Sequence, residues 1–135
     1  MTEYLLDTNH ISPLVTHGHP LRLRILAQLQ AGDQFSIATP ALHEFLFGIT
    51  SIPRATENLQ TWVSLKGLFK YYHVDQIAAE QSAQLRIILR RQGQQLEAID
   101  SFIAVIAARY DVILLTIFLR NGSGFLIVHA IRGGF

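Results

Sequence analysis

The chain alternates short apolar segments with longer segments of helical periodicity, and this alternation constrains its fold more than any other feature. The apolar segments, at 3–6, 34–39, 70–74 and 111–116, are typical of strands. Segments at 19–32, 40–49, 76–93 and 96–110 have helical spacing, and 51–69 is expected to be a loop that enters a helix around Trp62. Strands alternating with helices indicate a mainly parallel sheet covered on both faces.

The expected helix boundaries rest on a few residues with defined capping roles. Pro40 fits the first turn of its helix, and Thr39 is the predicted N-cap. Asp75 is predicted to cap the helix at 76–93, which would end at Gly93.

Composition bounds the class of protein. With 135 residues, half of them apolar, the chain can bury the core of one domain spanning 1–135. The absence of cysteine excludes disulfides and thiolate chemistry and suits a cytoplasmic protein. No apolar run approaches the roughly 20 residues of a membrane helix, so we expect no membrane association. A net charge of +1 neither requires nor opposes nucleic-acid binding.

Asp7 is the first candidate functional residue, because it ends the apolar run of "YLLDTNH" abruptly. Ligands of an open parallel sheet gather at the carboxyl ends of its strands, which favours a functional carboxylate. The alternative is structural, because Asp-Thr-Asn is also a suitable helix start.

Glu44 and Asp100 lie at the borders of apolar helix faces, from where a carboxylate can point into a cleft. Each has a structural alternative. Glu44 could be a solvated helix residue, and Asp100 a charge placed favourably near a helix N-terminus. His10, His17, His19 and His43 show no spacing of a zinc site, so surface or hydrogen-bonded roles are expected for them.

Three segments resemble the PIN-domain family, small metal-dependent ribonucleases that include the toxins of VapBC toxin–antitoxin pairs. They are "LLDTNHIS", "TPALHEFLFGI" and "GQQLEAIDSFIAVIAARYDVILLT", in the order and at the separations usual in the family. The resemblance spans about residues 3 to 116. It implies a PIN-like three-layer α/β/α sandwich with a mainly parallel central sheet.

The resemblance also implies a site. Asp7, Glu44 and Asp100 would be the catalytic and metal-binding residues, gathered into one acidic pocket at the sheet edge. A hard cation, Mg²⁺ or Mn²⁺, would relieve the repulsion between them through oxygen ligands. Asn9 would hydrogen-bond within the pocket, and Thr116 would line it. Glu97 does not match a family ligand position and is interpreted as a helix-start charge.

The tail 117–135 departs from the family. Phe118 stands where the family has a fourth polar group, and no acidic residue follows Thr116. Glycines and the apolar run "GFLIVHAI" follow instead, so we consider a shifted reading frame or replaced terminus beside a divergent native final strand. The exposed "FLIV" segment would favour strand association.

The leading functional hypothesis is a metal-dependent endoribonuclease toxin, with RNA as substrate, a cognate antitoxin as partner and a homodimeric state. The alternative is a catalytically impaired PIN-fold module that binds antitoxin or RNA without cleaving. A haloacid-dehalogenase-like phosphatase is a third possibility, but that family requires an aspartate where Asn9 stands.

Overall fold

A computed structural model describes residues 1–120 and 123–129, and for residues 116–120 and 123–129 it describes the backbone alone. The strands are β1 (Glu3–Leu6), β2 (Gln34–Ala38), β3 (Lys70–Tyr72), β4 (Ile113–Arg120) and β5 (Ser123–His129). The helices are α1 (Thr8–Ile11), α2 (Pro20–Gln30), α3 (Thr39–Thr50), α4 (Ala55–Leu65), α5 (Gln76–Arg91) and α6 (Ala98–Tyr110). Two 3-10 turns, Ser12–Val15 and Lys66–Leu68, complete the described elements.

The strands form one sheet in the order β3-β2-β1-β4-β5. The pairs β3–β2, β2–β1 and β1–β4 are parallel, and β5 pairs antiparallel with β4. The chain steps from β1 to β2 and β3 in one direction, and then returns past both strands to β4. Because parallel crossovers are right-handed, this reversal places the helices on opposite faces of the sheet.

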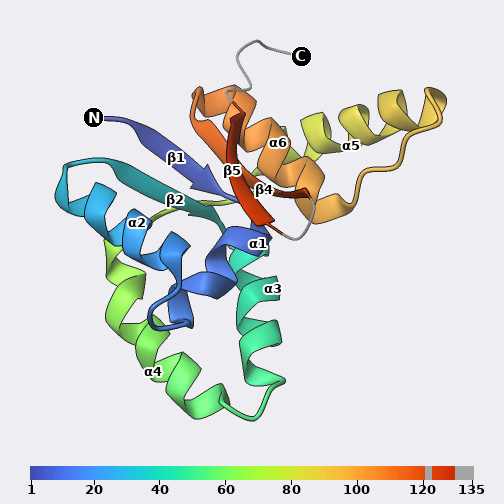
Figure 1. Cartoon of the computed structure of the whole chain (residues 1–135). Helices are drawn as coiled ribbons and strands as arrows, with labels where there is room; N and C mark the ends of the chain where they lie inside the picture. The colour runs from blue at the N-terminus through green and yellow to red at the C-terminus, as the bar shows by residue number, and fades with distance from the viewer. Residues whose placement is uncertain (121–122, 130–135) are drawn as a thin grey trace.

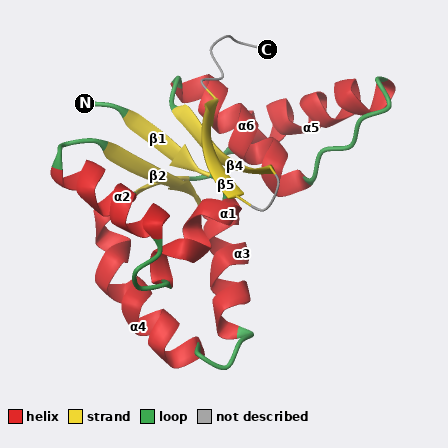
Figure 2. Ribbon diagram, viewed as in Figure 1, coloured by secondary structure: helices red, strands yellow, loops and turns green. Residues whose placement is uncertain are grey.

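Helices cover both sides of the strands, as Figures 1 and 2 show. α2, α3 and α4 lie on one side, and α5 and α6 lie on the other, with the outer end of α5 projecting from the body (Figure 1). The prediction of a three-layer α/β/α sandwich with a mainly parallel sheet is therefore confirmed.

The core is built on β1 and β2 and on the helix faces that cover them. Leu5, Leu6 and Ile37 have no exposed surface, and Ile103 and Ile106 of α6 are buried against the same cluster. Each such aliphatic side chain contributes about 1.5–3 kcal/mol through removal from water. The aromatic side chains of Trp62, Phe69 and Tyr72 are also buried in this core.

α5 is attached to the rest of the chain mainly through α6. The buried hydroxyls of Ser82 and Ser101 lie 2.5 Å apart across the two helices. Asp75 caps α5 by accepting a hydrogen bond from the backbone N–H of Ala78. Both oxygens of its carboxylate also accept from Nη1 of Arg109 on α6. Much of the surface of α5 therefore faces water.

Several predicted boundaries need correction. α3 begins at Thr39 with Ala38 as its N-cap and without a side-chain capping bond, so the prediction of Thr39 as N-cap is wrong by one residue. The Pro40 and Asp75 roles are confirmed. β3 is shorter than predicted, and β4 begins later because Asp111 adopts a left-handed conformation, φ 52°, after α6.

The tail forms the sheet edge within the described residues. β4 continues to Arg120, and the segment "FLIV" belongs to β5, which pairs with β4. Whether the terminus is native or frame-shifted stays a hypothesis. Among the described residues, none of the helices is both long and apolar enough to span a bilayer.

A partly buried polar network links β1, β2 and β3, the three neighbouring strands at one edge of the sheet. Glu3 of β1 accepts hydrogen bonds of 2.8 Å from the hydroxyls of Ser36 on β2 and Tyr72 on β3, and Lys70 lies 3.4 Å away. Burial by itself raises the pKa of Glu3, but these hydrogen bonds and the lysine charge outweigh it and hold the pKa below its usual 4.5. The network therefore stabilises the ionised form of Glu3.

We expect Glu3→Gln to lower the free energy of unfolding by about 1–3 kcal/mol at pH 7, because hydrogen bonds to a charged group are lost. A carboxyl group whose pKa is lower in the folded state than in the unfolded state stabilises the protein at pH values above its unfolded-state pKa. That stabilisation is lost as the pH falls through the folded-state pKa. The difference between the two proteins in urea unfolding should therefore shrink below about pH 4.5. Glu57→Gln is the control, because Glu57 is exposed on α4. A pH-independent difference would contradict the assignment.

Candidate functional site

Asp7 lies where β1 ends and α1 begins, at the point where the strand order reverses. Its backbone N–H donates to the carbonyl of Leu115 on β4, 3.3 Å away, which extends the pairing of the two strands by one residue. Its side chain caps α1 by accepting from the N–H of His10. The two interpretations of Asp7 are thus compatible, because the capping residue also stands at the carboxyl end of the central strand.

His10 holds the carboxylate of Asp7. Its Nδ1 lies 2.6 Å from Oδ1 of Asp7, and its side chain has no exposed surface. Because a carboxylate can only accept, Nδ1 carries the proton, and Nε2 is a buried atom without a hydrogen-bond partner. Both bonds use Oδ1, and no hydrogen bond of the described residues engages Oδ2.

An open cavity of about 520 Å³ lies beside Asp7, and we call it the acidic cavity. It is lined by residues from the start of α1, from α3 and from the start of α6: Asp7, Thr8, Asn9, Glu44, Glu97, Ala98, Ile99 and Asp100. Glu44 reaches it from the border of the α3 face that Ala41, Phe45 and Ile49 bury. Parallel strands and their following helices thus bring together acids from three distant parts of the sequence.

The structure brings Asp7, Asn9, Glu44 and Asp100 into one cavity, whereas their chemical roles stay a prediction. Thr116 lies on β4, next to the residue that pairs with Asp7, and its side chain is outside the described residues. For Phe118, too, only the backbone is described.

Glu97 is the residue that sequence reasoning underestimated. It stands at the N-cap position of α6 as a helix-start charge, but its side chain makes no capping bond and lines the acidic cavity. Its spacing of three from Asp100 places both acids on one side of the first helical turn, and this was the signal available in the sequence.

The acids of the cavity repel one another. Partial burial of the Asp100 carboxyl, together with the charges of Asp7 and Glu97, raises its pKa above the usual value. The same three carboxylates would lose this repulsion if a cation lay between them.

The donor set fits a hard divalent cation bound partly through water. All the charged groups at the cavity are carboxylates, and Asn9 adds an amide oxygen. Within residues 1–120 and 123–129, no three acid or imidazole groups are close enough together to ligate one ion directly. Mg²⁺ keeps several of its waters and uses only one or two carboxylates directly, so this arrangement suits that mode of binding.

Comparison with known families identifies one match. The model of the PIN domain family matches residues 4–118, which include all four acids of the cavity. No curated protein sequence matches the chain. The expectation of one domain over residues 1–135 stays a prediction.

Solved structures share the fold at low sequence identity. VapBC2 from Rickettsia felis, bound to a fragment of its promoter, matches with a TM-score of 0.74 and 18% identity over 85% of this chain and 86% of that one. DNA-bound VapBC from Salmonella typhimurium gives 0.69 and 22% over 83% of each chain. VapC20 from Mycobacterium tuberculosis, a toxin that cleaves the sarcin–ricin loop, gives 0.60 and 14% over 81% of this chain and 84% of that one.

Replacing His10 tests its support of Asp7. We expect His10→Leu to lower the free energy of unfolding by about 1–3 kcal/mol, because a similar apolar volume leaves the Asp7 carboxylate without its buried donor. His43→Leu, at an exposed histidine of α3, should change it by less than about 0.5 kcal/mol. Urea unfolding measures both, and equal effects would remove His10 from this role.

Proposed function

The chain belongs to the PIN domain family, and from this premise we propose that it is a metal-dependent endoribonuclease, the toxin of a toxin–antitoxin pair. The observation that carries the proposal is the convergence of Asp7, Glu44, Glu97 and Asp100 on one open cavity. Partial burial and the charges of Asp7 and Glu97 disfavour the ionised form of Asp100, which is unfavourable for stability alone and supports a role in binding a cation.

The proposed roles follow from the geometry of each residue. Asp7 would be a ligand of Mg²⁺ or Mn²⁺ through Oδ2, because His10 occupies Oδ1 and fixes the orientation of the carboxylate. Glu44 and Asp100 would hold the ion's waters from opposite elements. When bound, the cation lowers the pKa of a water for attack on a phosphodiester and neutralises charge on the phosphate.

Glu97 could replace the fourth polar group that the family has at the position of Phe118. The family position occupied by Phe118 supplies no acid, but Glu97 adds a fourth carboxylate to the cavity from the start of α6. We therefore expect Glu97 to compensate for this loss by ordering waters around the ion. Asn9 would hydrogen-bond to the same waters, and the role of Thr116 stays a prediction.

The proposed partners are an RNA substrate, a cognate antitoxin and a second copy of the chain. The structural neighbours support the first two, because VapC20 is a toxin that cleaves an RNA loop and the two VapBC structures contain toxin and antitoxin. Exposed apolar side chains such as Phe47, Val63 and Ile88 leave surface for the antitoxin or for a homodimer. A cytoplasmic location is part of the same proposal.

The second candidate function is a PIN-fold module that binds antitoxin or RNA without cleaving. The observation in its favour is Phe118 at the fourth polar position. Metal-dependent cleavage separates the two candidates.

We expect divalent ions to stabilise the protein against heat. Without metal, Asp100→Asn should raise Tm by a few degrees relative to the wild type, because it removes a charge that Asp7 and Glu97 destabilise. Millimolar Mg²⁺ or Mn²⁺ should raise the wild-type Tm and raise that of Asp100→Asn less, because an ion that binds only the folded state adds to its stability. Equal metal-induced shifts in both proteins, measured by scanning calorimetry, would contradict a metal site at the cavity.

We expect single-stranded RNA to be cleaved only in the presence of Mg²⁺ or Mn²⁺. Asp7→Asn should reduce the rate by at least about 100-fold, because the amide keeps the shape of the side chain but loses the ligand charge. Glu80→Gln, at an exposed acid of α5 outside the cavity, is the control and should keep the wild-type rate. No metal-dependent cleavage by the wild type would reject the nuclease in favour of the binding module.

A further inference from the structure

A second groove lies next to the acidic cavity, between α5 and the segment that leads to α6. Its volume is about 590 Å³, and Glu97 lines both this groove and the acidic cavity. We call it the α5 groove. Because the two hollows share Glu97 as a wall residue, they adjoin at the start of α6.

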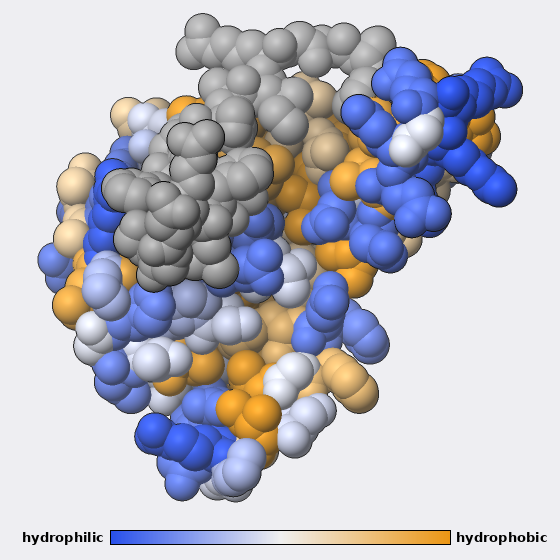
Figure 3. Space-filling view, turned by 45° about the vertical axis from the view of Figure 1, so that its right-hand side comes forward, coloured by the Kyte–Doolittle hydropathy of each residue, from blue (hydrophilic) through white to orange (hydrophobic). Residues whose placement is uncertain are grey.

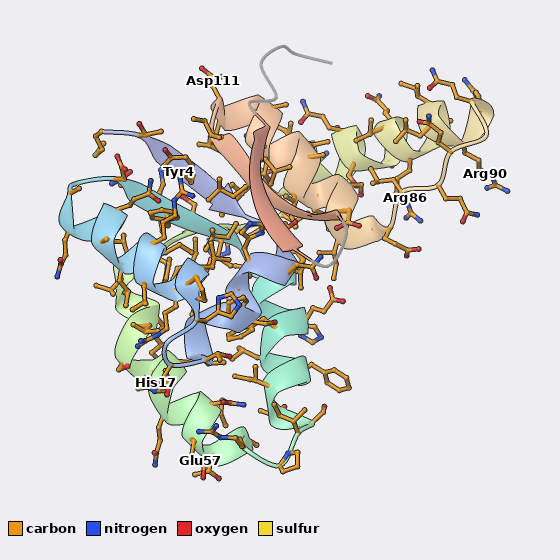
Figure 4. The ribbon with its side chains drawn as sticks, viewed as in Figure 1. Tyr4, His17, Glu57, Arg86, Arg90 and Asp111 are labelled. Atoms are coloured by element: carbon orange, nitrogen blue, oxygen red, sulfur yellow. The ribbon has the colours of Figure 1, made fainter. Side chains whose placement is uncertain are left out.

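The helix side of the groove is a regular stripe along α5. Ala83, Arg86, Ile87 and Arg90 line it, and their spacing of three, four and seven residues places them on one face. All four are exposed, and Figure 4 shows Arg86 and Arg90 on the outer half of the helix. The projecting end of α5 presents a mostly hydrophilic surface (Figure 3).

The other side of the groove is fixed by a turn at Gly93. Its φ of 78° is in the left-handed region, so glycine allows the chain to reverse directly after α5. The N–H of Gln94 then donates to the carbonyl of Leu89, and Nε of Arg86 donates to the carbonyl of Leu96, 3.0 Å away. This bond holds the returning segment beside the helix and keeps the Arg86 guanidinium at the groove wall.

Arg86 and Arg90 stand outside the ion pairs that the described residues form. The ion pairs of the described residues join His10 to Asp7, Lys70 to Glu3 and Arg109 to Asp75, and none includes Arg86 or Arg90. Two guanidinium groups four residues apart on a helix repel each other, so an anion between them would be favourable. Gln94 and Gln95 add amide hydrogen-bonding groups, Ile87 and Leu96 add apolar surface, and Glu97 places one carboxylate at the boundary with the acidic cavity.

We propose that the α5 groove binds the RNA strand that leads into the acidic cavity, with Arg86 and Arg90 contacting backbone phosphates beside the scissile one. The inference rests on the proposed function. A cavity lined by four acids repels a polyanion, so a nuclease of net charge +1 needs local positive charge to hold its substrate there. Arg86 and Arg90 supply it at the adjoining wall, whereas the amides and apolar side chains suit unpaired nucleotides.

The chain contains a matched control for these substitutions. Arg22 and Arg24 form a second arginine pair, on α2, and line neither hollow. Nε of Arg22 donates to the carbonyl of Leu14 at 2.9 Å, as Arg86 does to Leu96. The double variants Arg86→Gln/Arg90→Gln and Arg22→Gln/Arg24→Gln therefore remove equal charge and one equivalent hydrogen bond each.

The experiment measures binding and cleavage of one unstructured RNA oligonucleotide by the full chain. Binding is measured by fluorescence anisotropy in the Asp7→Asn background, and cleavage by steady-state kinetics with Mg²⁺ or Mn²⁺. The groove variant should weaken RNA binding and raise KM on the order of 10-fold, with kcat nearly unchanged. The slope of log K against log salt concentration should become less steep by roughly 1.4, the value for two lost phosphate contacts on a single strand. The α2 variant should match the wild type. If Arg86→Gln disturbs the turn, Arg90→Gln alone should change binding and KM in the same direction, because none of the side-chain hydrogen bonds of the described residues involves Arg90.

The outcomes separate this inference from the proposed function. Equal RNA binding by the groove and α2 variants would overturn the groove assignment. Metal-dependent cleavage by the wild type would in that case still support the proposed nuclease function. RNA binding that depends on the groove, without cleavage by the wild type, would support the groove and reject the nuclease. Equal RNA binding together with weaker binding of poly-glutamate would assign the groove to an acidic protein partner and overturn the proposal. No RNA binding by the wild type would overturn both.

Discussion

The parallel pairing of β1 with both β2 and β4 is the constraint on which the rest of the structure depends. β1 is only four residues long, yet it is the central strand and its Leu5 and Leu6 are fully buried. Parallel neighbours require helical crossovers, and the reversal of strand order sends these to opposite faces. As a result, α1, α3 and α6 meet at the carboxyl end of β1, where Asp7 follows the strand.

The same arrangement gives acidic residues different electrostatic environments at the two ends of the sheet. At the amino end of β1, Glu3 is satisfied by hydroxyls and a lysine from two neighbouring strands, and its ionised form is favoured. At the carboxyl end, Asp100 faces other acids and its ionised form is disfavoured. Of these two acids, only Asp100, at the end of the sheet where the acidic cavity lies, has its ionised form disfavoured, and perturbed groups of this kind are typical of functional sites. The α5 groove extends this end with charge of the opposite sign.

Much of the fold was predictable because its signals are local. The helix at α5 has a capping Asp75 before it and Gly93 after it, and both act as the sequence indicated. The prediction of Thr39 as an N-cap was wrong because the preceding residue, Ala38, already has the extended conformation of a cap. The helix therefore starts one residue earlier than predicted and has no side-chain capping bond. α1 was missed as a separate element, since a four-residue helix carries little periodicity, whereas a final strand was one of the alternatives considered for the apolar tail that contains β5.

For the candidate site, the sequence by itself determined the residue types: an aspartate that ends an apolar strand, and acids at the borders of helices, in an order typical of one family. Only the tertiary structure decided which of them meet. It turned the side chain of Glu97, the N-cap residue of α6, into the acidic cavity without a capping bond, and made His10 a buried partner of Asp7. It also set Arg86 and Arg90 in the groove that shares Glu97 with this cavity. The physical reason is that periodicity fixes the face of one helix at a time, whereas the distance between two helices depends on the crossovers and on the packing of the whole sheet.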